Sequence, residues 1–300
     1  MEVLRLPSNI KVHFAGSEVQ NHYLAVKYLG VNYALYTAFP FCERMVFGKG
    51  KSPIMPQRWM TNPAVDIPKE ICSSMKHVIQ DSGLFTLMFG SRKGEKGEAL
   101  INKWYDALIE FTLNHGQKAT CVEVDCQKIL GVEKAWEFRE RMKKDLPNNR
   151  IINVFHLEDG RKGLDRLIEY SEYIAISVPE LRFANKKNYV TQIAKYIKSK
   201  KPTIDIHLLG CTELTLLREN AKIATSADST TYISSKRWGF IGNRHISSIN
   251  TEKIRAFHPE VYEKLLEYNK EQNANFLIMS IEQLKRKYQD TCGNQDYKRI

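Results

Sequence analysis

Short runs of β-branched and aromatic residues alternate along this chain with longer stretches in which apolar residues recur at helical spacing. The pattern predicts a strand at residues 11–15 and then a helix at 17–29. Seven more strands are predicted at residues 31–39, 77–80, 119–124, 151–157, 173–178, 203–209 and 222–227. Helices between them are predicted at residues 98–114, 132–144, 164–171, 188–200 and 213–219.

Eight strands in strand–helix order favour an α/β protein built as a closed parallel (β/α)8 TIM barrel, because each helical crossover makes neighbouring strands parallel. The alternative is an open doubly wound sheet. Its dinucleotide-binding form is disfavoured, since the segment VHFAGSE after the first strand has one glycine where a G-x-G-x-x-G motif is needed.

Two regions depart from the alternation. Residues 40–74 contain five prolines and predict a long loop with at most short helical pieces. Beyond residue 232 the pattern changes to a loop at 234–248 and then to polar helices around 259–272 and 280–288, which we expect to pack outside the barrel. The predicted domains are therefore a catalytic barrel at 1–248 and a C-terminal helical extension at 249–300.

Charge and cysteine content narrow the class of protein. The 45 Lys and Arg residues exceed the 34 Asp and Glu residues and leave a net charge of +11, which favours a polyanionic partner such as nucleic acid. The six cysteines show no C-x-x-C spacing, so neither a zinc knuckle nor a disulfide framework is indicated. The absence of a long apolar stretch predicts no membrane contact and a location in the cytoplasm, the host's if the gene is a phage's.

The predicted strand ends are acidic. In a barrel of this kind the active site lies at the C-terminal ends of the strands. A single acidic residue there is usually a helix cap or turn former, but several strand ends that converge on one rim suit acid–base and nucleophilic chemistry at a glycosidic carbon. From the third strand to the eighth, these ends carry Asp81, Asp125, His156 with Glu158, Glu180, Gly210 and Asp228.

Taken in order, these segments resemble the tRNA-guanine transglycosylases and their relatives that act on DNA. QDSGLF is similar to the family motif DSGGF, which implies Asp81 as general acid and base, with Ser82 and Gly83 beside the base and Phe85 stacked on it. SADS is similar to FDC, which implies Asp228 as the covalent nucleophile. The remaining segments imply further residues that contact the purine: Asp125, His156, Ala175 and Ile176 through their main chain, Glu180, Leu209 and Gly210.

The sequence also departs from the family pattern at several positions. Leu84 and Thr86 replace a glycine and a glutamine of the first motif, and His156 stands where the family has a glutamine. The tRNA enzymes carry a C-x-C-x-x-C zinc lobe after the nucleophile, whereas only Cys292 follows Asp228 here. We therefore expect neither a metal nor another cofactor.

Basic loops after the strands are expected to bind the nucleic-acid backbone through phosphate contacts. The candidates are Arg44, Lys49, Lys51, Arg58, Arg92, Lys93, Lys236, Arg237 and Arg244. Residues 186–201 are also basic and contain no acid, which is typical of the solvated face of a helix.

The resemblance implies an enzyme that replaces guanine in DNA by a free 7-deazaguanine such as 7-cyano-7-deazaguanine, most like the DpdA-like enzymes of phages and bacterial DNA-modification clusters. Two alternatives stay open: a tRNA-guanine transglycosylase without the zinc lobe, and a barrel that binds nucleic acid without catalysis. The oligomeric state is not predicted.

Overall fold

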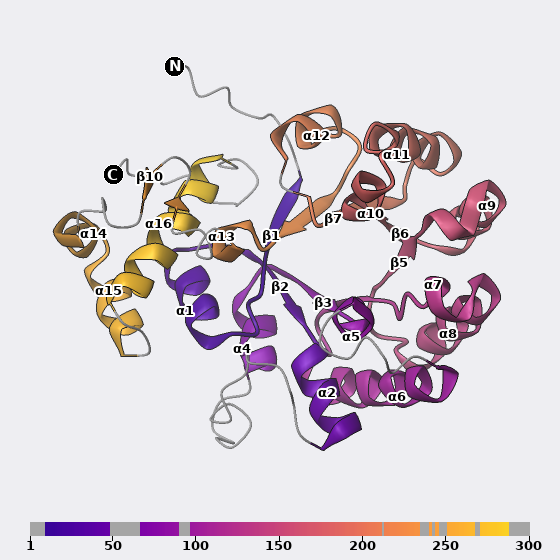
Figure 1. Ribbon diagram of the computed structural model, residues 1–300, viewed down its shortest axis with the longest axis horizontal. Helices are drawn as coiled ribbons and strands as arrows, with labels where there is room; N and C mark the ends of the chain where they lie inside the picture. Colours follow the sequence, from indigo (N-terminus) through magenta and orange to yellow (C-terminus); the bar gives the residue numbers. More distant parts are fainter. Residues whose placement is uncertain are drawn as a thin grey trace.

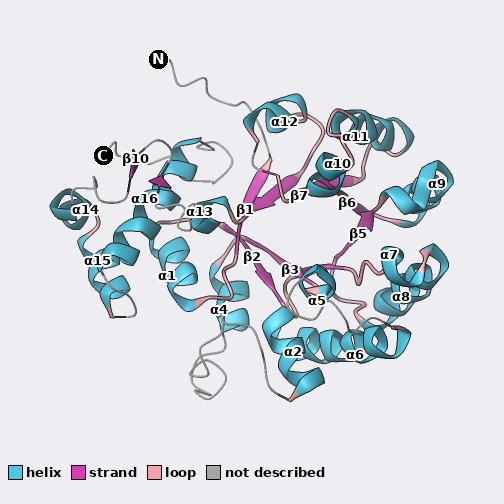
Figure 2. Ribbon diagram, viewed as in Figure 1, coloured by secondary structure: helices cyan, strands magenta, loops and turns pink. Residues whose placement is uncertain are grey.

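A computed structural model of the protein describes residues 10–48, 67–89, 97–211, 213–234, 240–241, 244–245, 251–267 and 271–287. Eight parallel strands form a closed barrel, in which β1 pairs with β2 on one side and with β8 on the other. Figures 1 and 2 show this ring of strands at the centre, surrounded by helices. The strands are β1 (Lys11–Ala15), β2 (Tyr33–Thr37), β3 (His77–Asp81), β4 (Thr120–Val122), β5 (Ile151–Phe155), β6 (Tyr173–Ser177), β7 (Asp205–Leu209) and β8 (Ser226–Ser229).

This architecture confirms the predicted (β/α)8 barrel and the order of its strands. Most strand boundaries lie within two residues of the prediction. The largest difference is at β8, which begins at Ser226 rather than at residue 222, because residues 220–224 turn back on the end of the preceding helix through main-chain hydrogen bonds to Asn220.

The barrel helices begin after the strand ends and return the chain to the opposite face. The helices predicted from the sequence are found with boundaries within four residues of the prediction: α1 (Gln20–Tyr28), α6 (Glu98–His115), α8 (Val132–Asp145), α9 (Gly160–Tyr170), α11 (Tyr189–Lys200) and α12 (Leu214–Glu219). Short pieces that the sequence pattern did not resolve are α2 (Phe39–Phe47), α4 (Ile67–Ser74), α5 (Leu84–Phe89), α7 (Gln127–Leu130), η1 (Leu157–Asp159), α10 (Val178–Phe183) and α13 (Thr231–Ser234).

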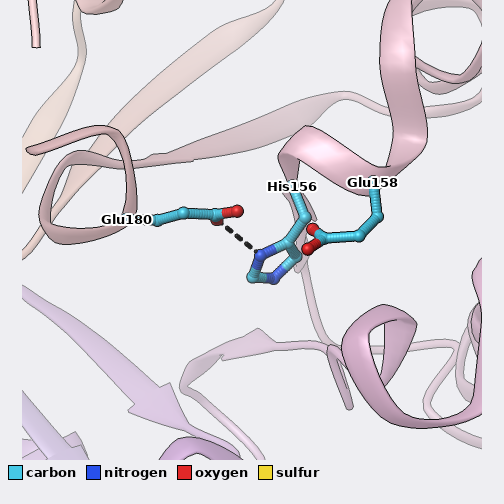
Figure 3. Close-up of side chains that lie close together, drawn as sticks. All are labelled: His156, Glu158 and Glu180. Atoms are coloured by element: carbon cyan, nitrogen blue, oxygen red, sulfur yellow. Dashed lines mark hydrogen bonds and ion pairs between the residues drawn. The ribbon is translucent and has the colours of Figure 1, made fainter. Parts of the chain in front are cut away.

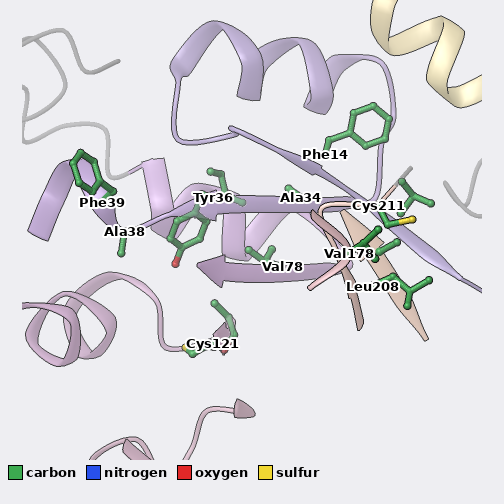
Figure 4. Packing of buried hydrophobic residues seen from close by; sticks show 14 of the residues in the cluster. Phe14, Ala34, Tyr36, Ala38, Phe39, Val78, Cys121, Val178, Leu208 and Cys211 are labelled. Carbon is green, nitrogen blue, oxygen red and sulfur yellow. Dashed lines mark hydrogen bonds between the residues drawn. The ribbon is translucent and has the colours of Figure 1, made fainter. Parts of the chain in front are cut away.

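Two apolar layers hold the barrel together. The larger one lies between the strands and the helices and includes the outward-facing Tyr36, Val78 and Leu208 (Figure 4). The smaller one fills the barrel interior with side chains from alternate strand positions: Ala15, Leu35, Ile79, Val122, Ile152, Val154, Tyr173 and Ala175. Because successive residues of a strand point to opposite faces, the same alternation decides which residues at the strand ends face the pocket above this layer.

A buried ion pair fixes α8 against the ends of β4 and β5. The Arg139 Nε atom donates to both carboxylate oxygens of Glu123, at 3.0 and 2.9 Å, and both side chains are almost fully buried. The Asn153 amide and the Val154 main-chain N–H donate to the same carboxylate. Buried charges need such complete pairing, so this cluster sets the register of the strand ends just before Asp125 and His156.

The C-terminal helices pack outside the barrel, as predicted. They are α14 (Thr251–Phe257), α15 (Pro259–Leu266) and α16 (Glu271–Lys287), and they gather beside α1 in Figure 1. Helices α15 and α16 contact α1, and α16 also contacts α13. A short antiparallel pair, β9 (Phe240–Ile241) and β10 (Arg244–His245), precedes them. Among all the helices described, none combines the length and apolar character needed to cross a bilayer.

Candidate active site

Three polar side chains reach the pocket end of the barrel by strand alternation. Ile79, Val154 and Ser226 lie inside the barrel, so Asp81, His156 and Asp228, two residues further on, also face inward. The charges of Asp125 and Asp228 both act on the carboxyl group of Asp81. The carboxylates predicted from the ends of strands three, four and eight therefore converge on one site.

Asp81 is held at the end of β3 by its neighbours. Its Oδ2 atom accepts a hydrogen bond from the Gly83 main-chain N–H at 3.1 Å, and its carboxyl group also bonds the Thr37 side chain. Desolvation, helped by the negative charge of Asp125, raises the pKa of Asp81 to about 6. A carboxyl group with this pKa is suited to both donating and accepting a proton near neutral pH.

Asp228 is buried at the end of β8. Its Oδ1 atom accepts a hydrogen bond from the Gly210 main-chain N–H at 2.7 Å and lies 3.1 Å from His207 Nε2. The other ring nitrogen of His207 is hydrogen-bonded to the Ser226 hydroxyl, which also bonds Tyr173. These contacts fix the orientation of the Asp228 carboxylate through its Oδ1 atom.

A second charged group lies at the ends of β4, β5 and β6. His156 Nε2 is 3.2 Å from Asp125 Oδ2, and His156 Nδ1 is 2.7 Å from Glu180 Oε2, as Figure 3 shows for the second pair. Burial alone would lower the pKa of His156, but the hydrogen bonds to the two carboxylates raise it to about 10. The imidazole is thus a cation at neutral pH. Burial would raise the pKa of Glu180, yet the bond to His156 and the Lys128 ammonium at 3.0 Å lower it to about 2.

His156, Glu158 and Glu180 offer three ligand atoms within 4.8 Å of one another, a separation that suits a metal ion (Figure 3). The Lys128 ammonium, however, lies 3.0 Å from Glu180 and 3.8 Å from Glu158. A lysine at this position already supplies the positive charge that a metal would bring. The group is therefore better described as an ion-pair network than as a metal site.

Glu18 is a site residue that the sequence analysis missed. It lies three residues after β1 and is buried, and its Oε2 atom accepts a hydrogen bond from the Thr37 main-chain N–H at 3.2 Å. Desolvation is the main cause that raises the pKa of Glu18 to about 7, and the charge of Asp81 adds to it. Thr37 thus links Glu18 to Asp81. The signal in the sequence is the acidic residue that ends VHFAGSE, just after the first predicted strand.

After Asp81, Ser82 and Gly83 are held in the fold by hydrogen bonds and close packing, whereas the Phe85 ring is exposed. The Ser82 hydroxyl accepts from the Leu84 N–H at 3.3 Å, and the Ser82 carbonyl accepts from Trp104 Nε1 at 3.0 Å. Gly83 has φ +74°, and a Cβ there would approach the Phe39 backbone to 2.7 Å, so only glycine fits. Gly83 holds Asp81 through its N–H, and the contact of Ser82 and Gly83 with the base stays a prediction. Phe85 is 64% exposed on α5, as a stacking surface requires.

The main-chain contacts of Ala175 and Ile176 with a base also stay predictions. Ala175 and Ile176 lie inside β6, in register with Val154 and Phe155 on one side and with His207 and Leu208 on the other. Their main-chain groups therefore take part in the sheet. The Gly210 N–H donates to Asp228, and its contact with the base stays a prediction. Leu209, by contrast, is half-buried on top of the interior layer, where it can form the apolar floor of the pocket.

Of the predicted phosphate-binding residues, only Arg44 has a described side chain. It lies half-buried on α2, which starts at the pocket end of β2. Arg244 is part of β10, and its main chain alone is described. The others lie outside the described residues: Lys49, Lys51, Arg58, Arg92, Lys93, Lys236 and Arg237.

No protein-family model matches the sequence. No curated protein matches it either. Solved structures of similar shape include an oxaloacetate acetylhydrolase, with 13% identity over 88% of this chain and 90% of that one and a TM-score of 0.46. A 2,3-dimethylmalate lyase matches at 12% identity over 95% of each chain, with a TM-score of 0.41. A psychrophilic family 10 endo-β-1,4-xylanase matches at 12% identity over 73% of this chain and 86% of that one, with a TM-score of 0.39. All three are enzymes by name, but likeness at this level does not bear on what this chain does.

Proposed function

We propose that this chain is an enzyme that replaces guanine in DNA by a 7-deazaguanine, such as 7-cyano-7-deazaguanine, through a covalent aspartyl–sugar intermediate. The observation that carries the proposal is the presence of two differently held carboxyl groups, Asp81 and Asp228, at the same end of the barrel. Asp228 is fixed by the Gly210 N–H and His207, whereas Asp81 has a pKa raised to about 6 by desolvation. One group suits bond formation to carbon, and the other suits proton transfer.

In the first step, an oxygen of the Asp228 carboxylate bonds to the sugar C1′ as the C1′–N9 bond breaks. The electron pair of that bond goes to guanine, and the proton of Asp81 neutralises the departing base. The products are a glycosyl ester on Asp228, an ionised Asp81 and free guanine. Because both carboxyl groups lie at the pocket end of the barrel, the attack and the proton transfer can be concerted on one nucleotide.

In the second step the incoming base reverses this chemistry. Asp81, now ionised, removes the proton from the ring nitrogen of the 7-deazaguanine, and that nitrogen bonds to C1′. The ester bond breaks, and its electrons return to the Asp228 carboxylate. Asp81 ends protonated, as it began, so the cycle needs no external oxidant, metal or nucleotide.

Guanine and a 7-deazaguanine present the same hydrogen-bonding edge, because they differ at ring position 7. That edge carries two donor positions beside one acceptor, O6. The carboxylate of Asp125 can accept from the donors, and His156, whose two N–H groups face Asp125 and Glu180, holds that carboxylate in place. Adenine has an acceptor at N1 where guanine has a donor, so it would set an acceptor against the Asp125 carboxylate, which supports selection of guanine-type bases.

The test is transfer of radiolabelled 7-cyano-7-deazaguanine into polymer by the full chain. Duplex DNA, single-stranded DNA and tRNA are offered in parallel, and the exposed-surface variant Asp106→Asn serves as control. Label in DNA that is absent with Asp228→Asn is the expected result. Label in tRNA alone would move the substrate to tRNA. Binding of nucleic acid with no label in any polymer would contradict the proposal and favour a barrel without catalysis.

A further inference from the structure

A short loop beside the pocket combines cations with exposed aromatic rings. Residues 182–189 have the sequence RFANKKNY, and no acidic residue occurs from residue 181 to 204. Phe183 is 84% exposed and Tyr189 is 52% exposed, which is unusual for large apolar side chains. We call residues 182–189 the basic–aromatic loop.

This loop lies on the pocket side of the barrel. It follows α10, which begins directly after β6, and α10 also carries Glu180, the partner of His156. A side chain added at Gly210 would meet Pro179 at 2.8 Å, so α10 packs against the same turn that holds Asp228. Figure 1 shows α10 close to the ends of β6 and β7. Phe183 is one helical turn from the charged network of the site.

The loop has a defined backbone conformation. The Lys186 N–H donates to the Leu181 carbonyl at 2.6 Å, the Asn185 N–H donates to the Arg182 carbonyl at 3.0 Å, and Asn185 has φ 56°. These bonds and the left-handed residue form a Schellman ending of α10. The position after the left-handed residue usually makes an apolar contact with the helix, but here it is Lys186, which is exposed. The loop thus presents a cation where a helix end normally buries a hydrophobic side chain.

The loop keeps a net positive charge after its own ion pairs are counted. Arg182 and Lys187 both pair with Glu213, the residue before α12. One carboxylate therefore faces two cations, and Lys186 adds a third. This arrangement fits a polyanion better than a neutral or basic surface.

We propose that the basic–aromatic loop binds the strand of DNA that flanks the nucleotide in the pocket, with Phe183 stacking on a neighbouring base and the cations contacting phosphates. An enzyme that takes a nucleotide out of its stack leaves the adjacent base face exposed, and an aromatic ring can cover it. Aromatic rings interleaved with cations suit single strands, because every base has a stacking face. The inference rests on the proposed function for the choice of DNA as the polymer.

The experiment is fluorescence anisotropy of a labelled single-stranded DNA of about ten nucleotides with the full chain. Phe183→Ala should weaken binding by about 10-fold, and Phe183→Trp should restore it, because stacking needs only an aromatic ring. Lys186→Gln should reduce the dependence of log K on log salt by about 0.7. Leu113→Ala is the matched control. Leu113 is 46% exposed near the end of α6 that leads into β4, on the opposite face of the barrel.

Equal binding by Phe183→Ala and the wild type would overturn the inference, as would an equal loss in Leu113→Ala. A change from dimer to monomer in Phe183→Ala with unchanged DNA binding would also overturn it, because the loop would then contact a second copy of the chain. Asp228→Asn separates the two proposals, since it should keep binding that depends on Phe183 while losing base exchange. Binding that depends on Phe183 in a wild type without exchange would overturn the proposed function alone.

Discussion

Two groups of carboxylates at the same end of the barrel differ in how their charge is balanced. Near β1 and β3, desolvation, with a smaller contribution from negative neighbours, raises the pKa of Glu18 to about 7 and the pKa of Asp81 to about 6. Near β4 to β6, Asp125 and Glu180 face the cations His156 and Lys128. The first group can carry a proton at neutral pH, whereas the second is a compensated network of fixed charges.

This difference separates two tasks within one pocket. A group that exchanges protons needs a pKa near the working pH, and burial beside like charge provides it. A surface that recognises a base needs donors and acceptors that do not change with pH, and ion pairs provide them. Residue type alone does not distinguish the two groups, since each contains one aspartate and one glutamate.

The largest expected effect is on stability, from His156→Leu. The change leaves Asp125 without its cation and Glu180 with Lys128 alone, which should lower the free energy of unfolding by about 3 kcal/mol. The raised pKa of His156 means that the folded state holds its proton more tightly than the unfolded state. The His156 contribution is therefore full below pH about 6.5, provided the carboxylates are ionised, and disappears as the pH rises through about 10.

Urea unfolding of His156→Leu between pH 5 and 10 measures this contribution. The control is His13→Leu, whose imidazole is buried against His77 instead of a carboxylate. Burial keeps the pKa of His13 well below its usual range. The loss of unfolding free energy in His13→Leu should therefore stay constant from pH 6.5 to 10. If the loss of unfolding free energy in His156→Leu also stays constant over this range, the variant has not removed a cation.

The next effect is on turnover, from Asp81→Asn. The variant keeps the nucleophile but has no proton to give to the leaving guanine, so kcat for base exchange should fall by about 100-fold or more. Steady-state exchange assays with Asp106→Asn as the surface control would measure it. The fold should be retained, since Asp81 supports the pocket rather than the core. Exchange within a few-fold of wild type would assign the proton transfer to another group.

The smallest effect is from Glu18→Gln, which should stabilise the protein at pH 8. The raised pKa means that the folded state binds the Glu18 proton more tightly than the unfolded state, so stability falls as the pH rises from about 4.5 through about 7. The amide removes the buried charge and can still accept from Thr37. We expect the free energy of unfolding to rise by about 2 kcal/mol at pH 8 and to stay unchanged at pH 4. The raised pKa of Glu18 sets an upper limit of about 3 kcal/mol on this gain. Thermal melts at the two pH values would measure it, and equal changes at both would contradict a buried charge at Glu18.

Features that depend only on the local sequence pattern were predictable from the sequence. The barrel followed from eight strand–helix alternations, and Asp81, Asp125, His156 and Asp228 followed from their positions after strands. Contacts between distant segments were not predictable. His207 touches Asp228 only because β7 and β8 are neighbours at that register, and Lys128 reaches Glu180 only through the short helix α7.

The partners of main-chain groups are the part of the site that motif order predicts least. Ala175, Ile176 and Gly210 were assigned to the base by their order in a motif, but main-chain groups serve whichever partner the strand register places beside them. The register of β6 engages the first two in the sheet, and the turn after β7 directs the Gly210 N–H to Asp228. Sequence order sets which residues reach the rim, whereas hydrogen-bond partners depend on the three-dimensional pairing.

The central claim, that Asp228 is the nucleophile, is tested most directly by trapping the covalent intermediate. Guanine-containing DNA is mixed with the wild type, Asp228→Asn or Asp125→Asn, denatured, and run on a denaturing gel. We predict a protein–DNA adduct with the wild type and with Asp125→Asn, and none with Asp228→Asn, because an amide cannot form the glycosyl ester. An adduct that persists in Asp228→Asn and disappears in Asp125→Asn would contradict the claim and move the nucleophile to the end of β4.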